Sequence, residues 1–457
     1  MVSVTDAVDS ALAHAQRLGG ADDTIVIVTD KAEASLRWAG NTMTTNGESV
    51  QRITTVVSIV RRGASAHVGT VTTTDINPAA VADVVRASQD AARSAPPADD
   101  AFALITDSGT PADWADAPAT TGADVFGGIA GALRRAFDGP DKLYGFAHHI
   151  VDTIWLATST GVRRRFTQPT GSVQINAKRG DASAWSGIST PWFDDVPVDS
   201  MLADLSTRLN WSAHTAELPA GRYETLLPPS AVADLMLSLS WEMAGRGAQE
   251  GRTAMSAPGG GTRVGEKLTD LGLTLSSDPT APGLECEPFV VSAASSEMAS
   301  VFDNGLDIGR VDWIRDGMID TLAYPRAAAV EFGAAPAAGC SNLLMTGGDA
   351  TLEEMIAATE RGLLLTTLWY IREVDPTTAL LTGLTRDGVY LIEDGTVSAA
   401  VNNFRFNESP LDLLRRTTQA GVSEITLPRE WSDWATRTRM PPLRIPDFNM
   451  SSVSQAQ

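Results

Sequence analysis

The stretch VVSIVRRGASAHVG, residues 56–69, has a counterpart later in the chain, SVQINAKRGDASAWSG, residues 172–187. In both stretches a strand-like run is interrupted by an Arg-Gly pair and then resumes. Two such runs around a glycine are typical of a β-hairpin. Because the same pattern occurs twice at a distance, it predicts a fold built by internal duplication.

The segments on either side of these hairpins extend the repeat. An amphipathic helix carrying Val8, Leu12 and Ala15 is expected before Gly19-Gly20, followed by strand-like runs at 24–28 and 35–40. WAGNTMTT at 38–45 resembles WLATSTGVRRRF at 155–166, and each copy ends in a helical pattern. We therefore predict an N-terminal α+β domain over 1–215, with these ranges: repeats 1–95 and 122–215, a surface linker rich in Pro, Asp, Ala and Thr at 96–121, and closing helices at 77–95 and 198–209.

The second half, 216–457, is predicted to be β-rich with a few helices, so that the whole chain falls in the α+β class. A helix is expected after Pro228-Pro229, with Ser230 as its N-cap. Another is expected over 351–362, where Thr351 and Glu354 have capping-box spacing and Gly362 is a stop signal. Hairpin turns are expected at three Asp-Gly pairs: Asp316-Gly317, Asp387-Gly388 and Asp394-Gly395.

Composition limits the classes of function. The 457 residues are 43% hydrophobic and 20% charged, as in globular proteins, and contain no run of about 20 apolar residues. A formal charge of −21 argues against a nucleic-acid partner, which requires a basic surface. The first residues show no signal-peptide pattern, and Cys286 and Cys340 alone form no disulfide framework. We expect a cytoplasmic protein with no membrane partner.

The stretch SWEMAGRG, residues 240–247, carries the strongest chemical signal. On a continuous helix Leu235, Leu239, Glu242 and Arg246 would share one face. Hydrolytic zinc sites place a general-base Glu beside a His ligand. Here the neighbouring positions hold Trp241, whose indole only donates, and Arg246, which stays protonated. Neither can bind zinc, so no metal and no catalytic residue is expected in this degenerate motif.

This stretch resembles the TldD/PmbA proteins, the modulators of DNA gyrase. The catalytic member carries His-Glu-x-x-Gly-His, of which Glu242 and Gly245 match while Trp241 and Arg246 replace the two histidines. Its further zinc ligand is a late cysteine, and no cysteine follows Cys340. The resemblance extends over nearly the whole chain and is closest in three later segments: 302–320, 347–395 and 401–414. It implies the kind of subunit that lacks zinc.

The resemblance implies a non-catalytic, zinc-free subunit of a heteromeric metallopeptidase, inactive alone. A zinc-bearing TldD-like paralogue would supply the metal, and unfolded or small peptides would be the substrate, in leader-peptide removal or proteolysis. An alternative is a stand-alone or homodimeric modulator that binds a peptide or a protein such as DNA gyrase, with an acidic surface that could mimic DNA. A third alternative is an enzyme with rebuilt chemistry that uses Glu242 without a metal.

Other residues have both a structural and a functional interpretation. Glu242 and Arg246 have the i, i+4 spacing of a helical ion pair, and Trp241 is expected in packing or in an interface. NNFRFNES, residues 402–409, predicts a strand with two aromatic residues on one face. Asn403, Arg405 and Asn407 would line the other face, either as the polar side of a half-buried strand or as a tentative binding track for a peptide or partner.

Three further features are assigned no chemistry. His148 and His149 are adjacent in a strand-like run, so they point to opposite faces and are not expected to share a metal. The glycine-rich segment 257–263 lacks the following Lys-Ser/Thr of a phosphate loop. Cys340 has no histidine nearby in the sequence to activate it as a nucleophile.

Overall fold

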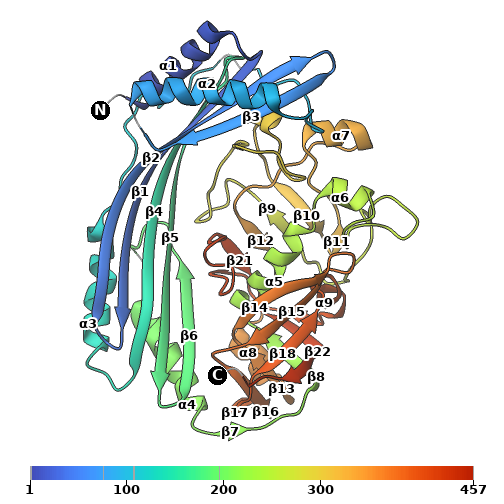
Figure 1. Ribbon diagram of the computed structural model, residues 1–457. Helices are drawn as coiled ribbons and strands as arrows, with labels where there is room; N and C mark the ends of the chain where they lie inside the picture. Colours follow the sequence, from blue (N-terminus) through green and yellow to red (C-terminus); the bar gives the residue numbers. More distant parts are fainter. Residues whose placement is uncertain (1–2, 76, 107–108, 195, 456–457) are drawn as a thin grey trace.

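The computed structural model describes residues 3–75, 77–106, 109–194 and 196–455. A long antiparallel sheet from the first half of the chain stands beside a β-rich unit from the second half (Figure 1). The α+β class is confirmed, as is the succession of a duplicated helix/β-meander region and a β-rich region with a few helices.

The N-terminal sheet has the strand order β3-β2-β1-β4-β5-β6 within the described residues. The two repeats therefore meet at the antiparallel pair β1–β4, and their hairpins extend outward in opposite directions. The strands are β1 Asp23–Ala39, β2 Met43–Arg62, β3 Ser65–Thr73, β4 Lys142–Thr158, β5 Arg163–Arg179 and β6 Ala182–Ser189.

Both predicted hairpins form, with the Arg-Gly pairs at their turns. Gly63 and Gly180 adopt positive φ angles of 63° and 59°, a conformation that glycine reaches without steric cost. The runs expected at 24–28 and 35–40 are in fact one strand, β1. Its buried face continues through Ala32 and Ala34 while polar residues alternate on the other side.

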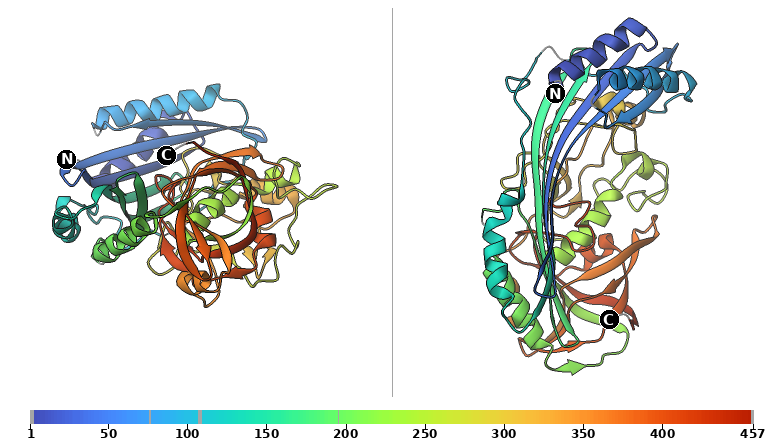
Figure 2. Two further views of the ribbon diagram at one scale, coloured as in Figure 1. Left: turned by 90° about the horizontal axis from the view of Figure 1, so that it is seen from below. Right: turned by 60° about the vertical axis from the view of Figure 1, so that its left-hand side comes forward.

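Two pairs of helices cover opposite ends of this sheet. The helices α1 and α2 pack against Val26 and Val28 near the start of β1, whereas α3 and α4 pack against Leu36 and Trp38 near its end. Figure 2 (right) shows α3 and α4 on the face turned away from the C-terminal unit. Their bounds are α1 Val4–Leu18, α2 Pro78–Ser94, η1 Ala123–Phe126, α3 Gly127–Ala136 and α4 Val198–Trp211.

The C-terminal unit consists of two sheets around one buried helix, α5. Figure 2 (left) shows strands curving around that helix. One sheet has the order β11-β10-β9-β12-β21-β20, and the other has β14-β15-β18-β22-β8-β13-β16-β17-β7 with β19 beside β22. The strands of the first sheet are β9 Leu275–Ser277, β10 Val311–Arg315, β11 Met318–Ile319, β12 Leu343–Met345, β20 Glu424–Thr426 and β21 Thr438–Met440.

The second sheet contains the longest C-terminal strand, β22. Its members are β7 Thr215–Ala216, β8 Gly221–Leu227, β13 Arg361–Leu365, β14 Leu368–Asp375, β15 Leu380–Thr385, β16 Val389–Glu393, β17 Thr396–Val401, β18 Phe404–Glu408, β19 Gln419–Ala420 and β22 Leu443–Val453. The helices of the unit are α5 Pro229–Trp241, α6 Gly245–Gln249, η2 Val301–Asp303, α7 Arg326–Phe332, α8 Leu352–Ala357 and α9 Pro410–Arg416.

Several local predictions in this unit were wrong. Helix α5 begins two residues earlier than expected, so Pro228 rather than Ser230 occupies its N-cap. The capping box of Thr351 forms as expected, but α8 ends before Gly362, which lies in β13 and pairs with Ile392. Tertiary strand pairing therefore overrides the helical pattern there.

Only part of the Asp-Gly prediction holds. Asp316-Gly317 joins β10 to β11 and Asp394-Gly395 joins β16 to β17, each as a hairpin. Asp387-Gly388 instead connects β15 to β16, which do not pair with each other in the described chain. The Asp387-Gly388 pair therefore marks a turn, but β16 after it pairs with β13 and β17 instead of β15.

Arg429 joins the sheet of the first half to the C-terminal unit. Its guanidinium lies between the rings of Trp185 in β6 and Trp369 in β14, at 5.2 and 4.8 Å from their centroids. It also donates to Gln174 in β5 across 3.2 Å. A desolvated cation between two aromatic faces is a strong contact.

None of the described helices is long and apolar enough to cross a membrane.

We expect Arg429→Ala to lower the free energy of unfolding by about 2 kcal/mol, because it removes the stacking between both units. The matched control is Arg386→Ala, since Arg386 also lies over the Trp369 ring but is half-exposed. Its loss should cost less than about 0.5 kcal/mol. Denaturant unfolding of the two variants measures the difference, and equal effects would contradict the bridging role.

Candidate functional site

The degenerate motif lies at the end of α5, a helix buried around its whole circumference from Ala231 to Leu239. Within it, the fully buried carboxyl of Asp234 accepts the backbone N–H groups of Arg429, Glu430 and Trp431 at 3.2, 2.9 and 3.3 Å. Burial raises the pKa of Asp234 well above its ordinary value, although these three donors act in the opposite direction. The middle of the helix is thereby held against the 429–431 segment.

The helix does not continue through the motif. Helix α5 ends at Trp241, Glu242 caps it, and the chain is extended at Ala244 before α6 begins. Backbone bonds hold this break in place: Ala323 donates to the carbonyl of Met243 at 2.8 Å and accepts from Gly245 at 2.9 Å. The prediction of one helical face through Arg246 was therefore wrong, because a neighbouring extended segment takes the backbone groups.

Gly245, which matches the family motif, is required by close packing. A Cβ atom added there would lie 2.2 Å from the Tyr324 ring, a separation that real contacts do not reach. The Tyr324 hydroxyl in turn accepts a hydrogen bond from Gln249 in α6 at 3.2 Å. The ring of Tyr324 thus fills the space that every larger residue at position 245 would need.

Arg246 forms its ion pairs with the C-cap residue of α6 and with α7. Its guanidinium pairs with Glu331 and with Glu250, the latter at 3.3 Å, and lies over the Phe332 ring at 5.3 Å. The predicted Glu242–Arg246 ion pair does not form, because the break separates the two side chains. The cationic group at this position is instead neutralised by two carboxylates.

Trp241 combines packing with exposure. Its ring meets that of Trp431 edge to face at 4.7 Å between centroids, yet 47% of the residue is exposed. Trp434 lies nearby and is 82% exposed. Both tryptophans line a cavity of about 330 Å³ that also contains Cys340. Both rings therefore leave apolar surface uncovered by the rest of the described chain at the edge of this cavity.

Glu242 has the most perturbed acid–base chemistry of the motif. Burial and the adjacent carboxyl of Glu373 in β14 raise the pKa of Glu242 to about 8. No N–H or O–H group of the described chain donates to its buried Oε2. Near neutral pH the group therefore holds a proton, whereas a general base must be ionised.

The donor set does not fit a zinc ion. Zinc requires thiolate, imidazole or carboxylate ligands, and of the four motif residues only Glu242 offers one. Among the residues that the structure describes, no group of three His, Cys, Asp or Glu side chains lies close enough to hold a metal ion. That the protein itself carries no zinc stays a prediction.

The tentative binding residues lie on and beside β18. Phe404 and Phe406 are buried, whereas Arg405 points to solvent and donates to Thr382 at 3.2 Å. Strand β18 is flanked by β15 and β22, so its backbone cannot pair with an added peptide strand. Asn403 precedes β18, and its Oδ1 accepts a hydrogen bond from the Thr385 hydroxyl in β15. Any binding role of these residues would have to rely on side chains.

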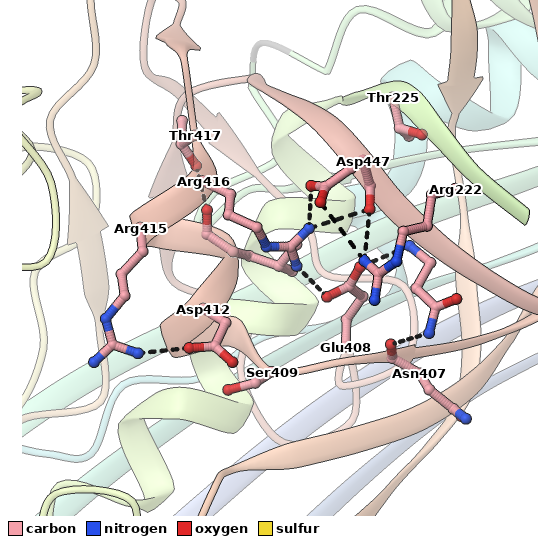
Figure 3. A network of polar contacts seen from close by, with 12 residues as sticks. Arg222, Thr225, Asn407, Glu408, Ser409, Asp412, Arg415, Arg416, Thr417 and Asp447 are labelled. Atoms are coloured by element: carbon pink, nitrogen blue, oxygen red, sulfur yellow. Dashed lines mark hydrogen bonds and ion pairs between the residues drawn. The ribbon is translucent and has the colours of Figure 1, made fainter.

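The end of β18 belongs to an ion-pair network that the sequence analysis missed (Figure 3). Glu408 accepts from Arg416 and from the backbone of Asn449, and Arg416 also pairs with Asp447. The Asn407 carbonyl accepts from the Asn449 side chain at 3.1 Å. The network ties β18, α9 and β22 together, so its evident role is structural.

His148 and His149 point to opposite faces of β4, as predicted. His148 bonds to Glu33 at 2.5 Å, and buried His149 contacts the Pro191 carbonyl at 2.7 Å. A pairing not visible in the sequence is that of Cys340 and Cys286. These free thiols lie within hydrogen-bonding reach of each other, and their proximity raises the pKa of Cys286.

A family model described as the PmbA/TldA metallopeptidase C-terminal domain matches residues 220–452. The match spans about half of the chain and includes α5, the helix break and β18. The chain belongs to the PmbA/TldA metallopeptidase family. The resemblance drawn from the sequence is thereby confirmed.

Solved structures share the fold over the whole chain. TldE from Thermococcus kodakarensis matches with a TM-score of 0.76 at 14% identity, covering 97% of this chain and 99% of that one. A candidate modulator of DNA gyrase from Bacteroides thetaiotaomicron matches at 0.79 with 16% identity, covering 99% and 100%. Another from Thermotoga maritima matches at 0.72 with 14% identity, covering 98% and 100%. No curated protein matches the sequence.

We expect Gly245→Ala to lower the free energy of unfolding by about 1–3 kcal/mol, because its methyl group would overlap the Tyr324 ring. Gly131→Ala in α3 is the control, since nothing lies within 4 Å of the added atom. That change should stabilise its helix by up to about 1 kcal/mol. Thermal or denaturant unfolding measures both, and a neutral Gly245→Ala would refute the packing argument.

Glu242→Gln should change the pH dependence of stability. The folded-state pKa of about 8 lies above the unfolded value of about 4.3. Between these two pH values the carboxyl of Glu242 is protonated in the folded protein and ionised in the unfolded chain. This contribution to stability is complete below pH 4 and is lost as the pH rises to 8. Allowing for partial exposure, we expect the free energy of unfolding of the glutamine variant to be higher than that of the parent by at least about 1 kcal/mol at pH 8.

Denaturant unfolding at pH 4, 6 and 8 tests this expectation. Exposed Glu217 supplies the control variant Glu217→Gln, for which no such pH-dependent gain is expected. A difference between Glu242→Gln and the parent that stays constant with pH would show that Glu242 is ionised in the folded protein.

Proposed function

We propose that this chain is the non-catalytic, zinc-free subunit of a two-component metallopeptidase, and that a zinc-bearing TldD-like relative carries out the hydrolysis. One observation carries the proposal. The two positions where the family motif has histidines hold Trp241 and Arg246, which lack a lone pair for a metal and are engaged elsewhere. A metal at this helix end would require both to be replaced and the Arg246–Glu331 ion pair to be broken.

The state of Glu242 supports the same conclusion. In a zinc hydrolase the corresponding carboxylate removes a proton from metal-bound water. Here burial and Glu373 raise the pKa of Glu242 to about 8, so most of the group is protonated near neutral pH, which disfavours that role. The same argument disfavours an enzyme with rebuilt, metal-free chemistry at Glu242.

The remaining role is to help bind an unfolded or small peptide and to complete an enclosed site with the partner. Exposed Trp241 and Trp434 offer apolar surface beside a cavity, which suits peptide side chains without selecting a sequence. In this proposal the zinc-bearing partner completes the site, and the side chains of Asn403, Arg405 and Asn407 contact the flexible peptide or the partner. The fold shared with TldE from Thermococcus kodakarensis is consistent with it.

The test is co-expression with a family member that carries the intact His-Glu-x-x-Gly-His motif. We expect this chain alone to bind less than about 0.1 zinc per chain and to leave unfolded peptides intact, because its motif supplies too few ligands. The mixture should elute as one 1:1 complex and cleave peptides. Metal analysis, size-exclusion chromatography and a fluorescent peptide assay measure the three outcomes.

Paired substitutions separate the roles of the two chains. Glu242→Gln in this chain should leave the activity of the complex within about twofold, whereas the equivalent change in the relative should reduce it by at least about 100-fold. Stoichiometric zinc and peptidase activity in this chain alone would overturn the proposal. A homodimer that does not bind the relative would favour the stand-alone modulator.

A further inference from the structure

Arg437 is a buried cation at the seam between the N-terminal sheet and the C-terminal unit. Only 8% of the residue is exposed. Its Nε donates to the Glu285 carbonyl at 3.1 Å, and its Nη2 donates to the Pro169 carbonyl and to the Thr170 hydroxyl, the latter at 2.5 Å. All three acceptors are neutral, and no described residue accepts from Nη1.

Several other buried or half-buried arginines among the described residues are neutralised directly. Four of them pair with a carboxylate at hydrogen-bond distance: Arg52 with Asp30, Arg326 with Asp303, Arg416 with Glu408 and Arg444 with Glu224. Arg429 is stacked between two tryptophan rings instead, with Asp387 4.0 Å away. Among the described residues Arg437 has no such partner. A buried charge without a counter-ion is costly, so its persistence calls for an explanation.

The acidic groups around Arg437 compensate its charge only from a distance. Burial lowers the pKa of Arg437, while Glu287 and Asp152 act in the opposite direction. The Glu287 carboxylate accepts the Ser341 hydroxyl at 2.6 Å. Burial raises the pKa of Asp152, which weakens it as a counter-ion. The guanidinium therefore retains attraction for a further anion.

Arg437 lines a cavity of about 310 Å³, here called the seam cavity. Hydroxyl groups and two aromatic rings make up much of its wall, including Phe166, Thr167, Thr170, Ser189, Trp192 and Thr436. Trp192 is 55% exposed, so the wall is open to water on that side. On its other side Arg437 also lines the cavity of about 330 Å³ beside Trp241. The cation thus lies between two hollows, one of which reaches the degenerate motif.

We propose that the seam cavity binds a carboxylate, with the Arg437 guanidinium as its counter-ion and neighbouring hydroxyls as further donors. The organic part of the ligand would lie against Phe166 and Trp192. A carboxylate fits better than a phosphate, because Arg437 is the one cationic side chain among the described residues of the lining, while Glu285 in the same lining would repel a second negative charge. The ligand is either a small free carboxylic acid or the C-terminus of a peptide.

This site needs only residues of this chain, so it does not depend on the proposed partner or on the absence of zinc. The test uses calorimetry with 3-phenylpropanoate and its neutral amide, and with an acetylated tripeptide as free acid and as amide. Each acid should bind at least about 10-fold more tightly than its amide, and less tightly as salt increases. Tighter binding of the peptide acid would assign the site to peptide C-termini, and the reverse order to free acids.

Arg437→Gln should abolish the preference for acid over amide. Arg439→Gln should keep it, because Arg439 lies on the same segment and donates to the Pro282 carbonyl without lining the cavity. Trp192→Ala should weaken 3-phenylpropanoate by about 3–10-fold while leaving the preference for the acid intact. This variant and the unmodified protein keep the test decisive if Arg437→Gln does not fold.

The proposal would be overturned by equal affinity of the unmodified protein for acid and amide, by an unchanged preference in folded Arg437→Gln, or by binding of inorganic phosphate more tightly than the carboxylates. An unaffected Trp192→Ala would equally exclude the seam cavity as the binding place.

Discussion

Asp234 lies inside α5 with no exposed surface, and three successive backbone N–H groups of the 429–431 segment point at its carboxyl. A buried acid of this kind is tolerated only where its oxygens are satisfied, so the segment cannot move independently of the helix. Arg429 then extends from this fixed segment to Trp185, and Arg437 follows eight residues later at the same seam. The Asp234 carboxyl therefore holds in place the segment through which the C-terminal unit contacts the N-terminal sheet.

The break between α5 and α6 determines what the motif can do chemically. In an unbroken helix Glu242 and Arg246 would neutralise each other on one face. In the observed structure Arg246 is drawn to α7, and Glu242 is left beside another acid. Two residues four positions apart therefore occupy different electrostatic environments, one neutralised by carboxylates and the other holding a proton.

Local signals in the sequence were sufficient for the duplicated hairpins, the capping box at Thr351 and the α+β class. They failed where distant segments compete for backbone groups. Nothing between Trp241 and Gly245 forbids a helix, and the break exists because Ala323 pairs with the chain there. Gly362 and Asp387-Gly388 were misassigned for the same reason, since strand pairing decided their surroundings.

The seam cavity and the thiol pair lay beyond sequence reasoning for a related cause. Arg437 meets β5 and the Glu285 carbonyl only because three segments far apart in the chain converge. Cys286 and Cys340 are likewise separated by 54 positions. No characteristic spacing of residues in the sequence indicates either arrangement. The chemistry of both sites also depends on burial, which a single sequence does not show.

The duplication has left two equivalent half-strands with different surroundings. Residues 163–171 of β5 extend beyond the pairing with β6, and Arg437 covers this edge by bonding to Pro169. The corresponding stretch of β2, 43–53, extends beyond β3, and no described strand pairs with its outer edge. Polar residues make up most of that stretch, including two charged ones, Glu48 and Arg52, which discourages fibril-like association through an open edge. The two copies have thus diverged: the free edge of β5 contacts the C-terminal unit, whereas the free edge of β2 is protected from strand pairing by its polar side chains.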